Sequence, residues 1–260
     1  MRHTFLDRYH QGASLIHRLD PRLKLLATFL FVLATTSTQP GAWLTFGLLA
    51  VVAFTAILLS KVPLLDALKH STIALPFAGM VALSLPFTRG GQVLWSWQPF
   101  GWNLAVTDEG VILFVTVILK AWLSVMVSGL LIATTPFADL LLGMRALRLP
   151  AVLVSTISFM YRYLFVLVDE AMRLYTAREA RSAGDGGSVW WRARVLGGMV
   201  GSLFLRSYER SERIYAAMLS RGFGGEVRSL ARLGWRAVDT RAAVVWAAVL
   251  VTVVVVGRVV

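Results

Sequence analysis

Apolar segments about as long as a lipid bilayer is thick recur along this 260-residue chain. A helix crosses the hydrocarbon core with about 20 mostly apolar residues, and the candidate spans are 23–39, 42–60, 71–87, 110–135 and 240–257. The composition agrees, because 57% of the residues are apolar and only 15% are charged, whereas about 25% are charged in a soluble domain. The sequence predicts an all-α integral membrane protein.

The charged residues indicate how these spans are oriented. The chain has 26 Lys and Arg against 14 Asp and Glu, and basic residues gather on the cytoplasmic side of membrane proteins. Five spans and a cytoplasmic N-terminus place 23 of the 26 basic residues on that side, including the 16 arginines from Arg145 to Arg241. A sixth crossing at the apolar segment 151–168 would move most of those arginines outside. Because Arg162 also interrupts that segment, we interpret it as part of a long helix at the inner face.

This topology divides the chain into four parts and predicts a multi-pass protein of the cell membrane with about five transmembrane helices. The parts are a cytoplasmic N-terminal segment (1–22), a four-span region (23–135), a cytoplasmic module (136–239) and a final span (240–260). The outer loop 88–109 carries Trp95, Trp97 and Trp102, which is typical of the membrane–water interface; a gate or a partner contact is the alternative.

Two long helical patterns fill most of the cytoplasmic module. The first runs from Ala151 to Ala183, and the second, which is amphipathic, runs from Val189 to Arg221. Each ends in an arginine between small residues, and the two motifs are Ala180-Arg181-Ser182 and Ser220-Arg221-Gly222. Small neighbours let a helix end approach a groove, and the guanidinium offers a forked set of donors. An arginine in a last turn also offsets the helix dipole, but two copies ending successive helices favour docking.

This pair of motifs resembles the signature of the transmembrane (T) component of energy-coupling-factor (ECF) importers. The segments 19–26, Leu-Asp-Pro-Arg-Leu-Lys-Leu-Leu, and 212–223, which leads into the second motif, are similar to the same family. The resemblance covers essentially the whole chain and is strongest to the cobalt/nickel branch, CbiQ-like or NikQ-like. Ser220 stands where that family usually has Ala.

The resemblance implies a non-catalytic coupling subunit in the inner membrane of a bacterium. Two ABC-type ATPase subunits would receive Arg181 and Arg221, and their motion would pass to a membrane-embedded substrate-binding (S) subunit that carries cobalt or nickel, as in cobalamin biosynthesis. Membrane lipid is a further expected partner, and no nucleic acid or cofactor is expected. The expected contacts with the S subunit are Leu164, Phe165, Gly197, Gly201, Leu203 and Phe204. The two glycines, four residues apart, would alternatively allow close helix packing within this chain.

Other functions remain as alternatives. A vitamin such as biotin could replace the metal ion as the cargo. Lys120 is a charge within a span and suggests an ion-coupled secondary transporter as an alternative function. However, the five spans contain no Asp or Glu to complete a relay. We therefore expect Lys120 to pair within the bundle or to face a partner. His3, His10 and His17 are spaced by seven, which we attribute to chance because a metal site would need carboxylates around its ligands. Motifs of nucleophilic, zinc or phosphate-loop enzymes are absent from the sequence.

Overall fold

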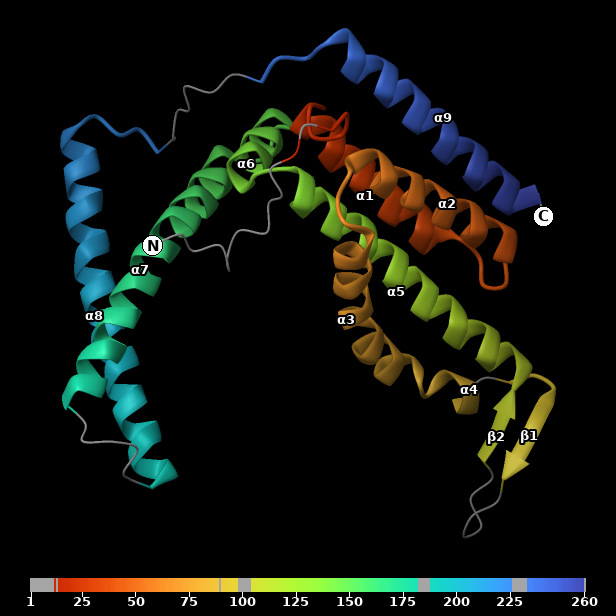
Figure 1. Cartoon of the computed structure of the whole chain (residues 1–260), viewed down its shortest axis with the longest axis horizontal. Helices are drawn as coiled ribbons and strands as arrows, with labels where there is room; N and C mark the ends of the chain where they lie inside the picture. Colours follow the sequence, from red (N-terminus) through yellow and green to blue (C-terminus); the bar gives the residue numbers. More distant parts are fainter. Residues whose placement is uncertain are drawn as a thin grey trace. The chain divides into compact units, whose positions relative to one another are not determined.

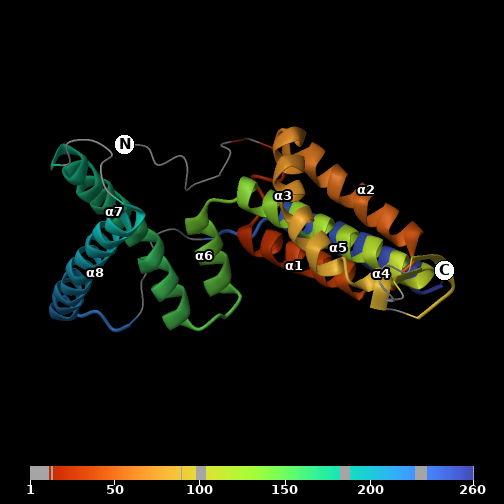
Figure 2. The same cartoon turned by 90° about the horizontal axis from the view of Figure 1, so that it is seen from below.

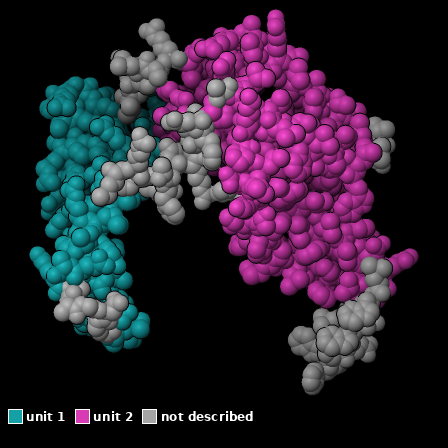
Figure 3. Space-filling view, in the orientation of Figure 1, with its two compact units in different colours: residues 1–3, 145–232 teal, residues 4–144, 233–260 magenta. Residues whose placement is uncertain are grey.

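The computed structural model describes residues 12, 14–88, 90–97, 104–181, 188–225 and 233–259. The chain forms two compact units, which Figure 3 distinguishes by colour. The first, the bundle unit, consists of Thr4–Met144 and Leu233–Val260, and the second, the two-helix unit, is built from Arg145–Arg232. Apart from the boundary after His3, which lies outside the described residues, the chain passes between the units from Met144 to Arg145 and from Arg232 to Leu233.

The bundle unit is organised around its longest helix, α5 (Asp108–Thr134) (Figure 1). Three helices pack against α5: α1 (Pro21–Ser37), α2 (Trp43–Ser60) and α3 (Leu64–Ala82). The short helix α4 (Leu85–Thr88) also contacts α5, α9 (Ala237–Val259) packs against α1 and α2, and α6 (Phe137–Ala146) follows α5. The hydrophobic core lies where α1, α2, α5 and α9 meet, with Phe31, Leu49, Ile57, Leu123 and Met126 at most 1% exposed.

Local chemistry sets the ends of the first hairpin of helices. Asp20 caps α1 by accepting the N–H of Arg22 at 2.9 Å, and Pro21 occupies the first helical position, where a missing N–H costs nothing. The turn between α1 and α2 includes Gly41 at φ +84°, a conformation that glycine adopts readily.

The expectation of an all-α membrane protein is confirmed, and among the described residues five helices are long and apolar enough to cross a membrane. Their identity differs in part from the prediction, because α1, at 17 residues, is too short for that set, whereas α7 (Ala151–Arg181) belongs to it. The helix α7 belongs to this set because its first half is apolar. The membrane sides assigned above stay a prediction.

The segment around the third predicted span also differs from the expectation. We expected 71–87, broken by Pro76 and Pro86, but α3 begins at Leu64 and continues through Pro76. Membrane helices tolerate such prolines because neighbouring groups satisfy the freed backbone. The expected outer loop contains an antiparallel pair of strands, β1 (Val93–Trp97) and β2 (Leu104–Thr107). Trp102 lies outside the described residues.

The two-helix unit consists mainly of α7 (Ala151–Arg181) and α8 (Val189–Ser220), which cross each other in Figure 2. Their starts agree with the predicted helices, and α8 ends one residue before the predicted end. The predicted end of the first helix at Ala183 lies outside the described residues. Ser188 begins α8 as its N-cap and accepts the N–H of Trp191 at 3.3 Å, which matches the preference for serine at that position.

Candidate docking site on the two long helices

The end of α8 is a built structure rather than a frayed turn. The Gly222 N–H donates to the Leu219 carbonyl and the Phe223 N–H to the Met218 carbonyl, both at 3.0 Å. Gly222 has φ +78°, so the three features form a Schellman motif. Arg221 lies at the C-cap of this motif and is exposed. The second arginine of the sequence motif is therefore presented to solvent on an ordered backbone.

Phe223 ties this end of α8 to the other helix. Its ring packs edge-on against the ring of Phe159 in α7, with 6.1 Å between the centroids. Further along the crossing, Arg206 Nη1 of α8 lies 3.0 Å from Glu170 Oε1 of α7. The two contacts run in opposite order along the two helices, so α7 and α8 are antiparallel and are joined at two points.

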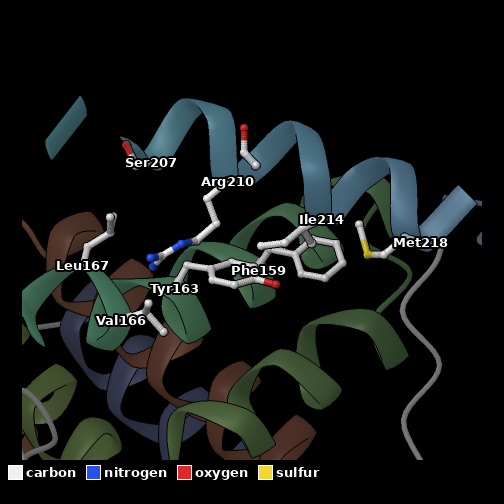
Figure 4. A pocket seen from close by; sticks show the side chains of 9 residues that line it. Phe159, Tyr163, Val166, Leu167, Ser207, Arg210, Ile214 and Met218 are labelled. Carbon is white, nitrogen blue, oxygen red and sulfur yellow. The ribbon is translucent and has the colours of Figure 1, made fainter. Parts of the chain in front are cut away.

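An apolar cavity of about 290 Å³ lies between those two contacts. Figure 4 shows the Arg210 side chain extending from α8 toward α7, close to Tyr163 and Val166. The lining residues are Phe159, Tyr163, Val166, Leu167, Ser207, Arg210, Ser211, Ile214 and Met218. The pocket opens to the surface, so it is a groove between the two helices rather than an interior void.

The first arginine motif lies at the other helix end. Ala180 and Arg181 are exposed, and Arg181 is the last described residue of α7. Ser182 lies outside the described residues. Ser220, at the end of α8, is also exposed, and its hydroxyl donates to the Ala217 carbonyl at 3.0 Å. Both arginines therefore stand at helix ends with their side chains accessible, as a docking group must.

The residues expected to contact an S subunit are largely accessible. Phe204 is 66% exposed and Leu164 is 39% exposed, while Leu203 and Phe165 are partly buried. A Cβ placed on Gly197 or on Gly201 would meet no atom within 4 Å. The described part of the chain therefore supplies no helix that packs closely on these glycines.

The polar residues singled out in the sequence have local partners. Lys120 Nζ donates to the carbonyl oxygens of Thr36 at 2.8 Å and Thr38 at 2.7 Å, which confirms pairing within the bundle. The ring of His17 lies 2.7 Å from Ser14 Oγ through Nδ1. His3 and His10 lie outside the described residues.

Sequence reasoning missed the contacts that hold the helices together. Antiparallel packing of the two helices would have allowed Glu170 to pair with Arg206. The sequence does not single out this pair, because charged residues are so frequent on both helices that many pairings were possible. A buried cluster of Asp20, Lys24 and Asp239 was also missed, although Asp20 and Lys24 lie in the 19–26 segment and Asp239 directly precedes the last predicted span.

An apolar helical bundle with several helices long enough to cross a membrane is typical of a multi-pass membrane protein. The family model of the CbiQ cobalt transport proteins matches residues 12–231. An energy-coupling factor transporter transmembrane protein EcfT of Bacillus selenitireducens is 31% identical over 90% of this chain and 90% of its own length. The EcfT of Brevibacillus brevis is 32% identical over 85% of each chain.

An uncharacterized protein of Methanocaldococcus jannaschii is also similar, at 28% identity over 88% of this chain and 78% of its own length. The family match covers well over half of the chain and the EcfT proteins match it nearly end to end. The chain therefore belongs to the CbiQ family and is a transmembrane T component of an ECF transporter.

Proposed function

We propose that this T component couples ATP hydrolysis by two ABC-type ATPase subunits to the import of cobalt or nickel ions by a membrane-embedded S subunit. The chain itself hydrolyses no ATP in this scheme. Arg181 and Arg221 each enter a groove on one ATPase and donate to carboxylate or carbonyl oxygens there.

The observation that carries this proposal is the exposure of both arginine tips on one pair of helices. Arg221 is held by the Schellman motif and by the packing of Phe223 on Phe159, so a pull on this tip is borne by both helices. A flexible tail with the same arginine would bind but would transmit little movement. The ordered tip supports a mechanical role for Arg221 beyond binding.

The apolar surface of the two helices supports a second partner. No residue of α8 is buried within the described chain, although the helix is 32 residues long, and Val200, Phe204 and Leu205 are each more than 60% exposed. A contiguous exposed apolar surface marks an interaction site. The S subunit occupies this surface in our proposal, with Gly197 and Gly201 allowing its helices to approach α8 closely.

The topology of the proposal follows the positive-inside rule. The N-terminus and the two-helix unit lie on the cytoplasmic side of the bacterial inner membrane, and α7 is a coupling helix even though its first half is apolar. Its second half carries Arg173, Arg178 and Arg181, which would be costly to place within the membrane and are disfavoured on its outer side. The helix α1 crosses the membrane instead; its 17 residues span about 25 Å at the α-helical rise.

The cargo is the part of the proposal that rests on the family description, cobalt transport protein. A vitamin such as biotin is the alternative, because the names of the EcfT relatives specify no cargo. Uptake of Co²⁺, Ni²⁺ and biotin by cells that express the complete transporter distinguishes the two. Accumulation of biotin without either ion would contradict the metal assignment.

The docking role is tested by replacing Arg181 and Arg221 together with alanine. The double variant should insert into the membrane and keep the S subunit but lose the co-purifying ATPases. A matched control removes Arg173 and Arg213, which lie eight residues before the two tips on the same helices, and whose side chains are 78% and 72% exposed. The control should keep the ATPases, because it removes the same charge from the same helices. An unchanged yield of ATPase with the first variant would refute the docking assignment.

The secondary-transporter alternative makes the opposite prediction. In that case the purified chain alone, in liposomes, would move substrate down an ion gradient. Pairing of Lys120 with the backbone carbonyls of Thr36 and Thr38, at the end of α1 and just after it, favours a structural role for this lysine. We expect no transport by the chain alone.

A further inference from the structure

A buried polar cluster connects several helix ends of the bundle unit and plays no part in the docking scheme. Its three charged members, Asp20, Lys24 and Asp239, are only 6%, 7% and 2% exposed. Asp239 lies in the first turn of α9, where its Oδ2 accepts the Arg236 N–H at 2.9 Å. Its Oδ1 accepts the N–H of Asp20 at 3.0 Å. One carboxylate thus joins the start of α9 to the residue that caps α1.

Lys24 joins α1 to the end of α5. Its Nζ donates to the Thr134 carbonyl, the Thr135 hydroxyl and the His17 carbonyl, each at 3.2 Å. Because α5 ends at Thr134 and α6 begins at Phe137, this ammonium holds the junction between those two helices.

The charges in the cluster match the helix ends around them. Helix N-termini carry partial positive charge and C-termini partial negative charge, so the carboxylates of Asp20 and Asp239 lie at N-termini and the Lys24 ammonium at a C-terminus. Asp139 of α6 is a further carboxylate that attracts Lys24. Buried charges that lose a partner are left uncompensated, so the cluster favours one arrangement of these four helix ends.

The residues of the cluster also lie close, along the chain, to the connections between the two units. The bundle unit is connected to the two-helix unit through Met144–Arg145 and Arg232–Leu233. Thr135 and Asp139 precede the first connection by ten residues or fewer, and Asp239 follows the second by six. Both covalent connections therefore lead directly to the same buried cluster.

We propose that Asp20, Lys24 and Asp239 are positioning residues that transmit movement of α7 and α8 to α1 and α5 of the bundle. This inference rests on the coupling function proposed above. Movement of the two-helix unit pulls on α6 and on the start of α9, and the cluster makes those two elements move with α1 and α5. Without it, each connection would yield separately, and ATP hydrolysis would proceed with little transport.

Lys120 provides a matched control within the same pair of helices. It projects from α5 to the carbonyls at the end of α1, as Lys24 projects from α1 to the end of α5. The two lysines bridge the same helices, and of the two only Lys24 contacts the segment between α5 and α6, which leads to the first connection. A merely structural role predicts that Lys24→Met destabilises the complex without lowering the transport obtained per ATP.

The experiment compares Lys24→Met, Asp239→Asn and Lys120→Met in the complete complex, reconstituted in liposomes. For each we would measure the co-purifying ATPase, the rate of ATP hydrolysis and the Co²⁺ taken up per ATP. The first two variants should keep ATPase and hydrolysis but lose uptake per ATP by about fivefold or more, the lower end of typical coupling effects. Lys120→Met should stay near the wild type, and Lys24→Arg, which retains charge and donors, should restore coupling.

A second readout is independent of the cargo. The chain contains no cysteine, so spin labels at Arg173→Cys and Thr252→Cys, one in each unit and both at exposed positions, report the ATP-dependent change in distance between the units. This change should be larger with Lys24→Met than with the wild type, because the bundle no longer follows the two-helix unit, and it should be unaltered with Lys120→Met.

Three results would overturn the proposal. The first is a Lys24→Met variant with unchanged uptake per ATP and unchanged label distance, and the second is an equal loss of uptake per ATP with Lys120→Met. The third is loss of the assembled complex in both the Lys24→Met and Asp239→Asn variants. A wild-type complex that moves no Co²⁺ would refute the cargo only, because the label distance still tests the cluster. Retention of ATPase by the Arg181 and Arg221 double variant would refute the docking scheme only.

Discussion

Replacing Gly222 with alanine should loosen the last turn of α8 without disturbing the rest of the protein. Gly222 has φ +78°, and an L-residue with a Cβ pays about 1–2 kcal/mol in this region. A Cβ at this position would meet no atom within 4 Å, so no steric clash adds to the conformational cost. The free energy of opening the Schellman motif should fall by the same 1–2 kcal/mol, roughly a factor of 5–30 in its equilibrium.

Hydrogen–deuterium exchange of a peptide that covers 215–223 measures this opening directly. Exchange in that peptide should quicken by the factor above, while the peptides of α5 should be unaffected. Gly224→Ala is the matched control, because Gly224 is also uncrowded but lacks a left-handed φ. Gly222→Asn should fall between wild type and alanine, since asparagine tolerates this conformation better. In the proposed complex, the affinity of the Arg221 tip for its ATPase should fall by up to the same factor.

Equal exchange in Gly222→Ala and wild type would show that the helix end is not held by the motif. Equal acceleration by Gly224→Ala would show that the loss of any glycine, rather than the left-handed φ, loosens the turn. Either result would refute the reasoning about the tip, whatever its partner.

Two further substitutions test the packing of α5, each by thermal or chemical unfolding in detergent. Gly110→Ala should lower the free energy of unfolding by about 1–3 kcal/mol, because its Cβ would lie 2.7 Å from the Leu85 carbonyl oxygen. In the control Gly129→Ala, in the same helix, the Cβ meets nothing within 4 Å, so this variant should be neutral or stabilising. Equal effects of the two substitutions would show that a steric clash at Gly110 is not the cause. Thr116→Val should raise the free energy of unfolding by about 1 kcal/mol. The reason is that Thr116 is 2% exposed and its hydroxyl has no hydrogen-bond partner among the described residues. A destabilised variant would instead indicate a partner for that hydroxyl.

The starts of both helices of the two-helix unit and the end of α8 were predictable nearly to the residue, because local chemistry determines where a helix begins and ends. Ser188 caps the start of α8 and Gly222 adopts the left-handed conformation after its end, and both preferences are properties of single residue types. The third span was harder to predict. Pro76 reads as a helix breaker in isolation, but α3 packs along α5 over much of its length, and that packing favours the continuous helix.

For the charged residues, too, the sequence indicated the residue but not its partner. Lys120 was recognisable as a charge within a span, but its partners are backbone carbonyls at Thr36 and Thr38. Every residue has a carbonyl, so the sequence carries no signal of which one will accept. Asp20 and Asp239 are 219 positions apart, and neither residue alone marks the other as its partner.

The amino-acid sequence by itself determined that this is a helical membrane protein, that its basic residues gather in one long segment, and that two successive helices end in arginine motifs. Hydrophobic length, charge distribution and capping chemistry are all local properties, and each is legible along the chain. Only the tertiary structure decided that Phe223 secures one arginine tip to α7 and that a single buried cluster meets both connections to the two-helix unit. Those features depend on residues far apart in sequence that become neighbours only when the helices pack.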